Sequence, residues 1–145
     1  MKVILQRVLK AECIVEQKVI SAIDKGFMLL VGFTHSDTEK EVEQMASKIA
    51  KLRVFEDANG KMNLSLNDVK GSILSISQFT LYANTKEGNR PSFIDAMRPD
   101  PANILYQKFN EKLISLGIKV YSGVFGADMK LNVTCDGPVT IQLEY

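Results

Sequence analysis

The sequence has few of the residues on which metal sites and disulfide frameworks depend. Its 145 residues include one histidine, His35, and two cysteines, Cys13 and Cys135. A structural zinc site needs about four ligands and a catalytic one about three. We therefore expect no metal site built from Cys and His, although an oxygen-ligated ion is not excluded. Both cysteines lie in strand-like stretches, and we interpret them as small buried apolar residues rather than as a disulfide.

The chain also lacks a charge excess and a long apolar run. Its formal net charge is +1, whereas a protein that grips a long stretch of nucleic acid usually carries a clear basic excess. Any contact with RNA is therefore expected to be short or local. The longest apolar run, residues 27–33, is too short to cross a bilayer, and the N-terminus has no signal-peptide pattern. We predict a cytoplasmic protein without a membrane partner.

Common nucleotide-binding and hydrolase motifs are missing too. The sequence contains no Gly-x-Gly-x-x-Gly and no Gly-x-x-x-x-Gly-Lys-Ser/Thr, and it has no Gly-x-Ser-x-Gly elbow. His35 is the only candidate imidazole base, and its place beside a helix-capping signal favours a loop or cap residue. A Ser-His-Asp triad stays open at this point, since triads are recognised by geometry rather than by chain order.

What is present is a pattern of strands around two helices, with no linker or repeat that would divide the chain. We expect one domain over residues 1–145. The run at residues 27–33 predicts a central strand buried on both faces. Capping-box spacings at Ser36 and Thr38 then predict a helix. A second helix is expected to start at Asp100 and to end at Gly117.

Three strands are predicted to close the domain, over residues 119–125, 129–135 and 139–144, with Asp136-Gly137-Pro138 in the turn between the last two. The order is strands, helix, strand, helix, strands, which is not a βαβ alternation. It predicts an α+β fold dominated by antiparallel pairing.

Residues 73–82 read as one long strand followed by a polar loop over residues 83–99, which is long enough to suggest a functional role. Side chains alternate along a strand, so Gln78, Thr80 and Tyr82 would place an amide, a hydroxyl and a phenol on one face. The alternative is that Thr and Tyr are simply good strand formers on a wet face.

The Gly137-Pro138 pair has two interpretations. Gly-Pro between strands is ordinarily a turn. A cis bond, a minority state fixed by its context, would instead turn two neighbouring carbonyls the same way and create a rigid pair of backbone acceptors.

Six short motifs occur in an order and at a spacing that resemble the bacterial D-aminoacyl-tRNA deacylase family along essentially the whole chain. They are Gln6-Arg7-Val8, Gly60-Lys61-Met62-Asn63, Ser77-Gln78-Phe79-Thr80-Leu81-Tyr82, Asn89-Arg90-Pro91-Ser92-Phe93, Gly123-Val124-Phe125-Gly126-Ala127-Asp128-Met129 and Asp136-Gly137-Pro138-Val139-Thr140.

The resemblance implies a compact α+β domain with a strongly curved, barrel-like sheet and two main helices, acting as a homodimer without a cofactor or metal. It implies that Ser77, Gln78, Phe79 and Thr80 line the pocket for the 3′-terminal adenosine carrying the amino acid. The Gly137-Pro138 pair of the partner subunit would enter the same pocket with a cis bond. Met129 resembles a further pocket residue, and Arg7 the residue that holds the Gly-Pro loop.

The implied reaction is hydrolysis of the ester in D-aminoacyl-tRNA. Backbone N–H groups near Phe79 and Thr80 would stabilise the oxyanion, a contribution of roughly 3–4 kcal/mol per donor at comparable sites. A rigid backbone wedge near Cα would reject L-amino acids of every size, whereas glycine, with no side chain, would be cleaved.

Thr80 admits two roles: a nucleophile that forms an acyl-enzyme, or a hydrogen-bonding residue beside an attacking water helped by the substrate 2′-hydroxyl. The second is favoured because no base is evident next to Thr80. Two other functions stay open, a non-catalytic dimeric binding module for an amino-acid-like ligand or RNA end, and a hydrolase of other small acyl esters.

Overall fold

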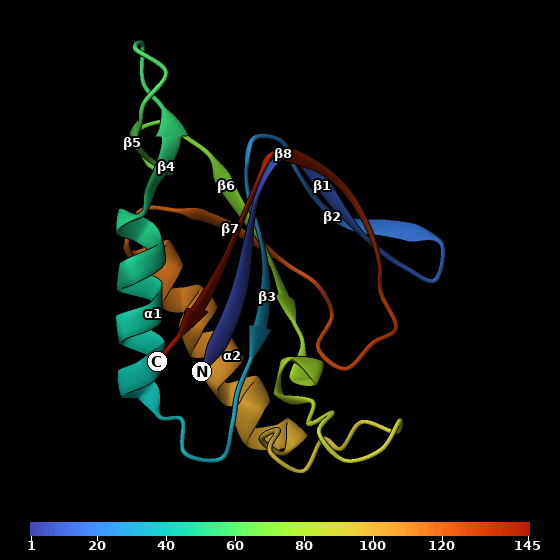
Figure 1. The fold of residues 1–145 in the computed structure, drawn as a ribbon. Helices are drawn as coiled ribbons and strands as arrows, with labels where there is room; N and C mark the ends of the chain where they lie inside the picture. The colour runs from blue at the N-terminus through green and yellow to red at the C-terminus, as the bar shows by residue number, and fades with distance from the viewer.

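The computed structural model describes residues 1–145 as a strongly curved sheet with both long helices packed on one side (Figure 1). The strands are β1 (Lys2–Val15), β2 (Lys18–Ile23), β3 (Gly26–Gly32), β4 (Arg53–Glu56), β5 (Met62–Ser65), β6 (Ser72–Ser77), β7 (Lys119–Ser122) and β8 (Lys130–Glu144). The helices are α1 (Glu39–Lys51) and α2 (Pro99–Ser115), and a 3₁₀ turn, η1, covers Phe79–Tyr82.

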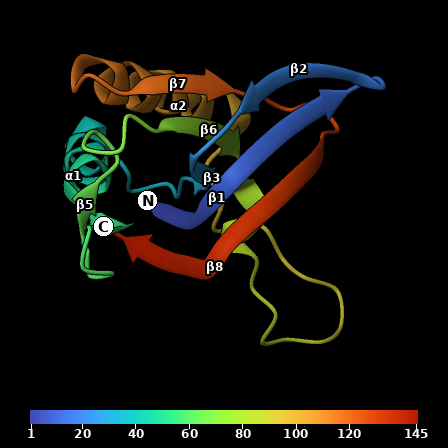
Figure 2. The same ribbon diagram turned by 90° about the horizontal axis from the view of Figure 1, so that it is seen from above.

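The main sheet has six strands, paired in the order β2-β1-β3-β6-β7, with β8 pairing β1 from its other side. The pairs that β1 makes are antiparallel, whereas β6 pairs both β3 and β7 in parallel. The sheet curls until its two ends meet, where the Ser21 hydroxyl of β2 donates a hydrogen bond to the Ser122 carbonyl of β7 over 2.6 Å. Figure 2 shows this curvature along β1 and β8. The predicted fold class, a single α+β domain with a barrel-like, mostly antiparallel sheet and two main helices, is confirmed.

The larger core lies between the helices and the sheet. α1 buries the apolar stripe Val42, Met45, Ala46 and Ile49, as expected for an amphipathic surface helix. On the sheet side, the Phe27 and Phe55 rings stack with their centroids 5.2 Å apart. No helix is both long and apolar enough to traverse a bilayer.

Local signals placed the helix ends closely. Thr38 is the N-cap of α1, and a complete capping box joins it to Glu41. Of the two predicted capping-box positions, Ser36 and Thr38, the second is therefore the one that forms. α2 begins at Pro99, one residue before the predicted start, because proline suits the first helical position. The chain leaves α2 through Gly117, whose φ of +84° favours a residue without a Cβ atom.

The predicted long strand over residues 73–82 is wrong beyond Ser77. The ladder between β3 and β6 ends at the pair Val31–Ser77, so the following residues have no partner strand and coil into η1. The predicted polar face of Gln78, Thr80 and Tyr82 does not form. Tyr82 is buried instead, and burial, followed by the charges of Asp37 and Glu144, raises the pKa of its phenol.

The predicted turn at Asp136-Gly137-Pro138 is also wrong. Residues 130–144 form the single strand β8, and the predicted strand over 119–125 stops at Ser122. β1 is long enough to pair both halves of β8, and a register shift between Gln6 and Val8 absorbs the Gly-Pro pair as an irregularity. Such bulges are the places where a sheet tolerates proline.

The cysteine interpretation holds for only one of the two residues. Both thiols are free; Cys13 is buried and Cys135 is exposed. Burial raises the pKa of the Cys13 thiol, which keeps this side chain neutral as an apolar core residue. Cys135 lies on β8 outside the core, so its predicted burial is wrong.

Candidate active site

A cleft of about 680 Å³ lies where the parallel strands β3 and β6 end. Its other walls are the segment over residues 93–99, the start of α2, and the segment over residues 125–131. Most of the lining side chains are apolar, which is typical of a site that takes a small organic group and orients it with a few polar atoms. The cleft therefore has the size and character of a ligand site.

The Gln78 backbone is fixed against the end of β3. Its N–H donates a hydrogen bond to the Val31 carbonyl over 2.7 Å. A Cβ atom at Gly32 would lie only 2.8 Å from the Gln78 carbonyl oxygen, so this close approach requires glycine at position 32. The sequence thus sets where the chain leaves the sheet and begins the η1 turn.

The η1 turn presents backbone donors beside the cleft. The first hydrogen bond of the turn runs from the Leu81 N–H to the Gln78 carbonyl, so the N–H groups of Phe79 and Thr80 have no acceptor inside the turn. The Gln78 side-chain amide donates a hydrogen bond to Thr80 Oγ1 over 2.5 Å. Both features lie at one corner of the cleft.

Four of the predicted site residues line this cleft, namely Ser77, Gln78, Phe79 and Met129. Thr80 is exposed and lies outside the lining, although it contacts Gln78. Met129 approaches Gly123 so closely that a Cβ atom there would be 2.5 Å from its sulfur. Packing against a glycine thus positions the Met129 thioether at the wall.

Gly137 and Pro138 do not join this cleft within one chain. Both are exposed on β8, their peptide bond is cis, and neither lines the cleft. Arg7 of β1 contacts the residue before this pair: its Nε lies 3.0 Å from Asp136 Oδ2. Its Nη1 donates a hydrogen bond to the Val54 carbonyl over 2.6 Å. The Nε–H is not directed at the carboxylate, so the contact to Asp136 is an ion pair rather than a hydrogen bond.

His35 has a structural contact. Its Nε2 lies 2.8 Å from the Ile94 carbonyl oxygen, and since a carbonyl only accepts, that nitrogen is the donor. The neighbouring Asp37 binds the Thr34 N–H and the Met1 amino group instead of the imidazole. This arrangement fits the loop role predicted for His35 and builds no Ser-His-Asp triad. No three His, Cys, Asp or Glu side chains gather closely enough to hold a metal ion.

Sequence reasoning missed Phe93 as a cleft residue. Its ring meets the Phe79 ring edge to face, with centroids 5.2 Å apart and planes at 71°, and both residues line the cleft. The Asn-Arg-Pro-Ser-Phe motif marked the segment, but nothing local to it indicates that the loop folds back beside η1.

A sequence model of D-Tyr-tRNA(Tyr) deacylase matches residues 4–144. The chain belongs to the D-Tyr-tRNA(Tyr) deacylase family. This membership confirms the resemblance seen in the motifs and the predicted enzyme class, a D-aminoacyl-tRNA deacylase. The family match covers both the Ser77–Thr80 segment and the Gly137–Pro138 pair.

Relatives in the family are similar over nearly their full length. The chain is 54% identical to the D-aminoacyl-tRNA deacylase of Bacillus pumilus (strain SAFR-032) and 55% identical to that of Exiguobacterium sp. (strain ATCC BAA-1283 / AT1b). Each alignment spans 144 residues, 99% of this chain and 98% of the relative.

Solved structures agree on the fold. A structure titled c-Myc DNA Unwinding Element Binding Protein superposes with a TM-score of 0.93 at 42% identity, over 100% of this chain and 99% of that one. A probable eukaryotic D-amino acid tRNA deacylase superposes with a TM-score of 0.86 over 98% and 97% of the two chains. At 17% identity, the second match supports the fold alone.

Proposed function

We propose that this protein, acting as one domain over residues 1–145, hydrolyses the ester bond of D-aminoacyl-tRNA and releases the free D-amino acid and the tRNA. The observation that carries the proposal is the corner where Ser77, Gln78 and Phe79 line an apolar cleft at the start of η1. Family membership supplies the substrate class. Because that substrate is an intermediate of translation, we place the reaction in the cytoplasm.

The proposed chemistry uses backbone donors rather than a metal or cofactor. An aminoacyl ester beside a free 2′-hydroxyl is already an activated acyl group, so the enzyme has to position water and stabilise an oxyanion. The N–H groups of Phe79 and Thr80, which have no acceptor within η1, are the proposed donors. Gln78 and Thr80 would orient the substrate through their hydrogen-bonded side chains.

Water is the proposed nucleophile, with the substrate 2′-hydroxyl assisting. The Thr80 hydroxyl has Gln78 as its side-chain partner, and an amide is not a base. A threonine nucleophile would need an adjacent base, and this partner does not supply one.

Rejection of L-amino acids is proposed to come from the partner subunit. Gly137 and Pro138 are exposed and lie outside the cleft of their own chain, which supports a homodimer in which each chain lends this pair to the cleft of the other. Arg7 would hold the pair in place through Asp136. A rigid main chain near the substrate Cα excludes an L side chain where it begins, whatever its length.

The same reasoning extends the substrate range to glycine. A glycyl ester has no side chain for the wedge to reject, so glycyl-tRNA should also be cleaved. Discrimination by apolar size yields only about 1–3 kcal/mol. A side-chain pocket therefore could not separate the D- from the L-form of every amino acid.

One assay tests the proposal: purified protein is incubated with D-aminoacyl-, L-aminoacyl- and glycyl-tRNA, and the remaining ester is followed over time. We expect loss of the D-ester and the glycyl ester while the L-ester persists. Equal loss of the D- and L-esters would indicate a general esterase. No loss of any ester would indicate a binding module, and cleavage of D-alanyl but not glycyl ester would contradict the wedge.

A further inference from the structure

The Phe79 and Phe93 rings at the cleft are both exposed, at 56% and 40% respectively. Their planes are inclined by 71°. A base that stacks on one ring therefore cannot be parallel to the other, because stacking requires nearly parallel planes. A single base could contact both rings only by stacking on one and meeting the other edge to face, so each ring keeps a face of its own for stacking.

The chain segment that carries Phe93 is held at several points. Asn84 and Ser92 exchange two backbone hydrogen bonds of 2.8 and 2.9 Å. The next carbonyl after Phe93, that of Ile94, accepts from His35, and the Asp95 carbonyl accepts from the Thr34 hydroxyl over 2.6 Å. The Phe93 ring is thus presented by a backbone fixed on both sides.

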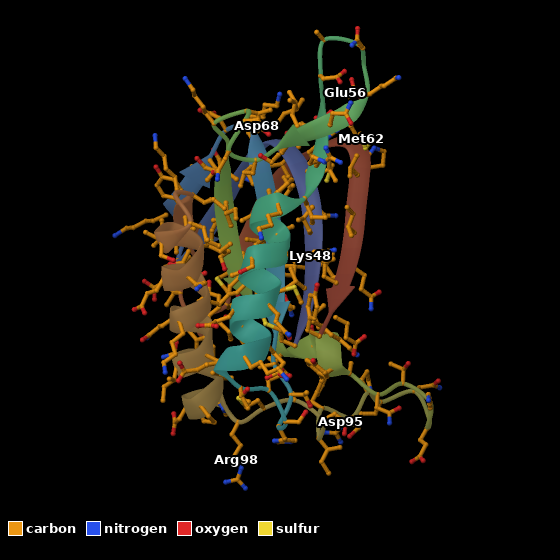
Figure 3. All side chains as sticks on the ribbon, turned by 90° about the vertical axis from the view of Figure 1, so that its left-hand side faces the viewer. Lys48, Glu56, Met62, Asp68, Asp95 and Arg98 are labelled. Atoms are coloured by element: carbon orange, nitrogen blue, oxygen red, sulfur yellow. The ribbon has the colours of Figure 1, made fainter.

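The surroundings of Phe93 are suited to a phosphate backbone. The loop between η1 and α2 carries three cations, Lys86, Arg90 and Arg98, against the two carboxylates Glu87 and Asp95, and none of the three cations forms an ion pair within the chain. Arg98 also borders the cleft, and Figure 3 shows its side chain projecting away from the fold, at the end of the molecule where Asp95 lies. Exposed aromatic rings beside cations are the usual means of holding single-stranded nucleic acid.

We infer that Phe93 is the stacking platform for the base of the nucleotide that precedes the acylated adenosine, with Arg98 and its loop near the connecting phosphate. The inference rests on the proposed function, since it assumes that the adenosine itself occupies the corner at Phe79. His35 acquires a role in this arrangement: it is a positioning residue that fixes the backbone next to the platform.

The test compares two substrates that share the reacting ester. One is D-aminoacyl-tRNA, and the other is the D-aminoacyl ester of adenosine alone, which has no preceding nucleotide. Loss of base stacking costs about 1–3 kcal/mol, so Phe93→Leu should raise KM for the tRNA by about 5- to 160-fold. We expect kcat to stay within about twofold and the adenosine ester to react as with wild type.

Two further variants make the test specific. Phe93→Tyr keeps an aromatic face and should restore the wild-type KM. Ile94→Ala removes the neighbouring side chain, which is 77% exposed and outside the cleft lining. It should leave KM and kcat unchanged for both substrates. The inference would be overturned if Phe93→Leu raised KM equally for both substrates, or left KM unchanged for both.

A binding measurement separates this inference from the proposed function. Fluorescence anisotropy of an uncharged oligonucleotide that ends in cytidine-cytidine-adenosine requires no turnover. Wild type should bind it more tightly than Phe93→Leu, by the same factor seen in KM, and equal binding would contradict the platform. A wild-type protein that binds the oligonucleotide but spares every D-ester would refute the proposed function alone.

Discussion

The side-chain amide of Gln78 donates a hydrogen bond to the hydroxyl of Thr80 over 2.5 Å. The two side chains come from a strand end and the first turn of η1, and they restrain each other at the corner of the cleft. Neither group is basic at neutral pH. This favours Thr80 as a hydrogen-bonding residue over Thr80 as a nucleophile.

Thr80→Ala should therefore slow hydrolysis of D-aminoacyl-tRNA only modestly. A lost hydrogen bond is worth about 0.5–1.5 kcal/mol, which corresponds to a rate decrease of about 2- to 13-fold. A nucleophile would lose on the order of 10⁴-fold or more. Single-turnover rates measure the difference, and a trapped acyl-enzyme in the wild type would establish the nucleophilic role.

A substrate without the terminal 2′-hydroxyl tests the proposed assistance to water. General acid–base help typically contributes about 10²–10⁴-fold, so D-aminoacyl-tRNA ending in 2′-deoxyadenosine should react on the order of 10²-fold more slowly. Its binding should be nearly unchanged. Equal rates for the two substrates, measured under single-turnover conditions, would remove the hydroxyl from the mechanism.

Arg7→Lys should weaken chiral selection. Lysine keeps the charge but lacks the planar fork that reaches Asp136 and the Val54 carbonyl together. A buried acceptor left unpaired costs about 1–3 kcal/mol of unfolding free energy. We expect the D-to-L rate ratio to fall on the order of tenfold, equivalent to about 1.4 kcal/mol.

The control for that variant is Arg53→Lys on the exposed start of β4, which should alter neither stability nor the rate ratio. If Arg7→Lys lowers the midpoint of denaturation while the D-to-L ratio stays at its wild-type value, Arg7 supports the fold and not the selection.

Mixed dimers test whether active sites are shared between chains. Gln78→Ala impairs the cleft, and Gly137→Ala impairs the lent segment, because its φ of +114° suits glycine and the new Cβ would lie 2.9 Å from Val139. Each variant alone should be poorly active. Refolding both together should recover about a quarter of wild-type activity, since half the dimers then hold one intact site of two. Activity no greater than the mean of the two variants would argue for sites within single chains.

The cap of α1 gives a prediction for pH dependence. The pKa of Glu41 is lowered, first by the hydrogen bond from the Thr38 hydroxyl and then by that from the Thr38 backbone N–H. Because the pKa in the folded state is the lower one, this contribution is complete above the ordinary carboxylate pKa. It is lost as the pH falls through the lowered value.

Thr38→Ala should accordingly reduce the unfolding free energy by about 1 kcal/mol at neutral pH, and by less in acid, where Glu41 is protonated in both proteins. Urea denaturation at several pH values measures the difference in unfolding free energy between variant and wild type. The control is Thr85→Ala in an exposed loop, which should leave the unfolding free energy unchanged. A deficit that grows toward acid pH would contradict the assigned sign.

The sequence predicted best those features that neighbouring residues determine. The Thr38–Glu41 capping box, the turn out of α2 at Gly117, and the buried strand over residues 27–33 follow from local spacing. The ends of β6 and β8 depend instead on distant partners: β6 stops where β3 ends, and β8 runs through Gly137-Pro138 because β1 continues alongside.

The candidate site divides in the same way. Family motifs indicated Ser77 to Thr80 and Met129, and four of these five residues line one cleft. Phe93 was not predicted, because its place beside Phe79 depends on contacts with Asn84 and His35 that bring remote segments together. No periodicity within residues 83–99 encodes that arrangement.

The contact between β2 and β7, marked by the Ser21 hydroxyl, leaves the main sheet with one open edge. Two edge strands face each other, and the outer side of β8 is the ladder that stays open. Pro138 interrupts the row of N–H donors along that ladder, and a broken row is a poor template for unrelated strands. The same Pro138 for which a role in substrate selection is proposed therefore also leaves this open edge with one backbone donor fewer.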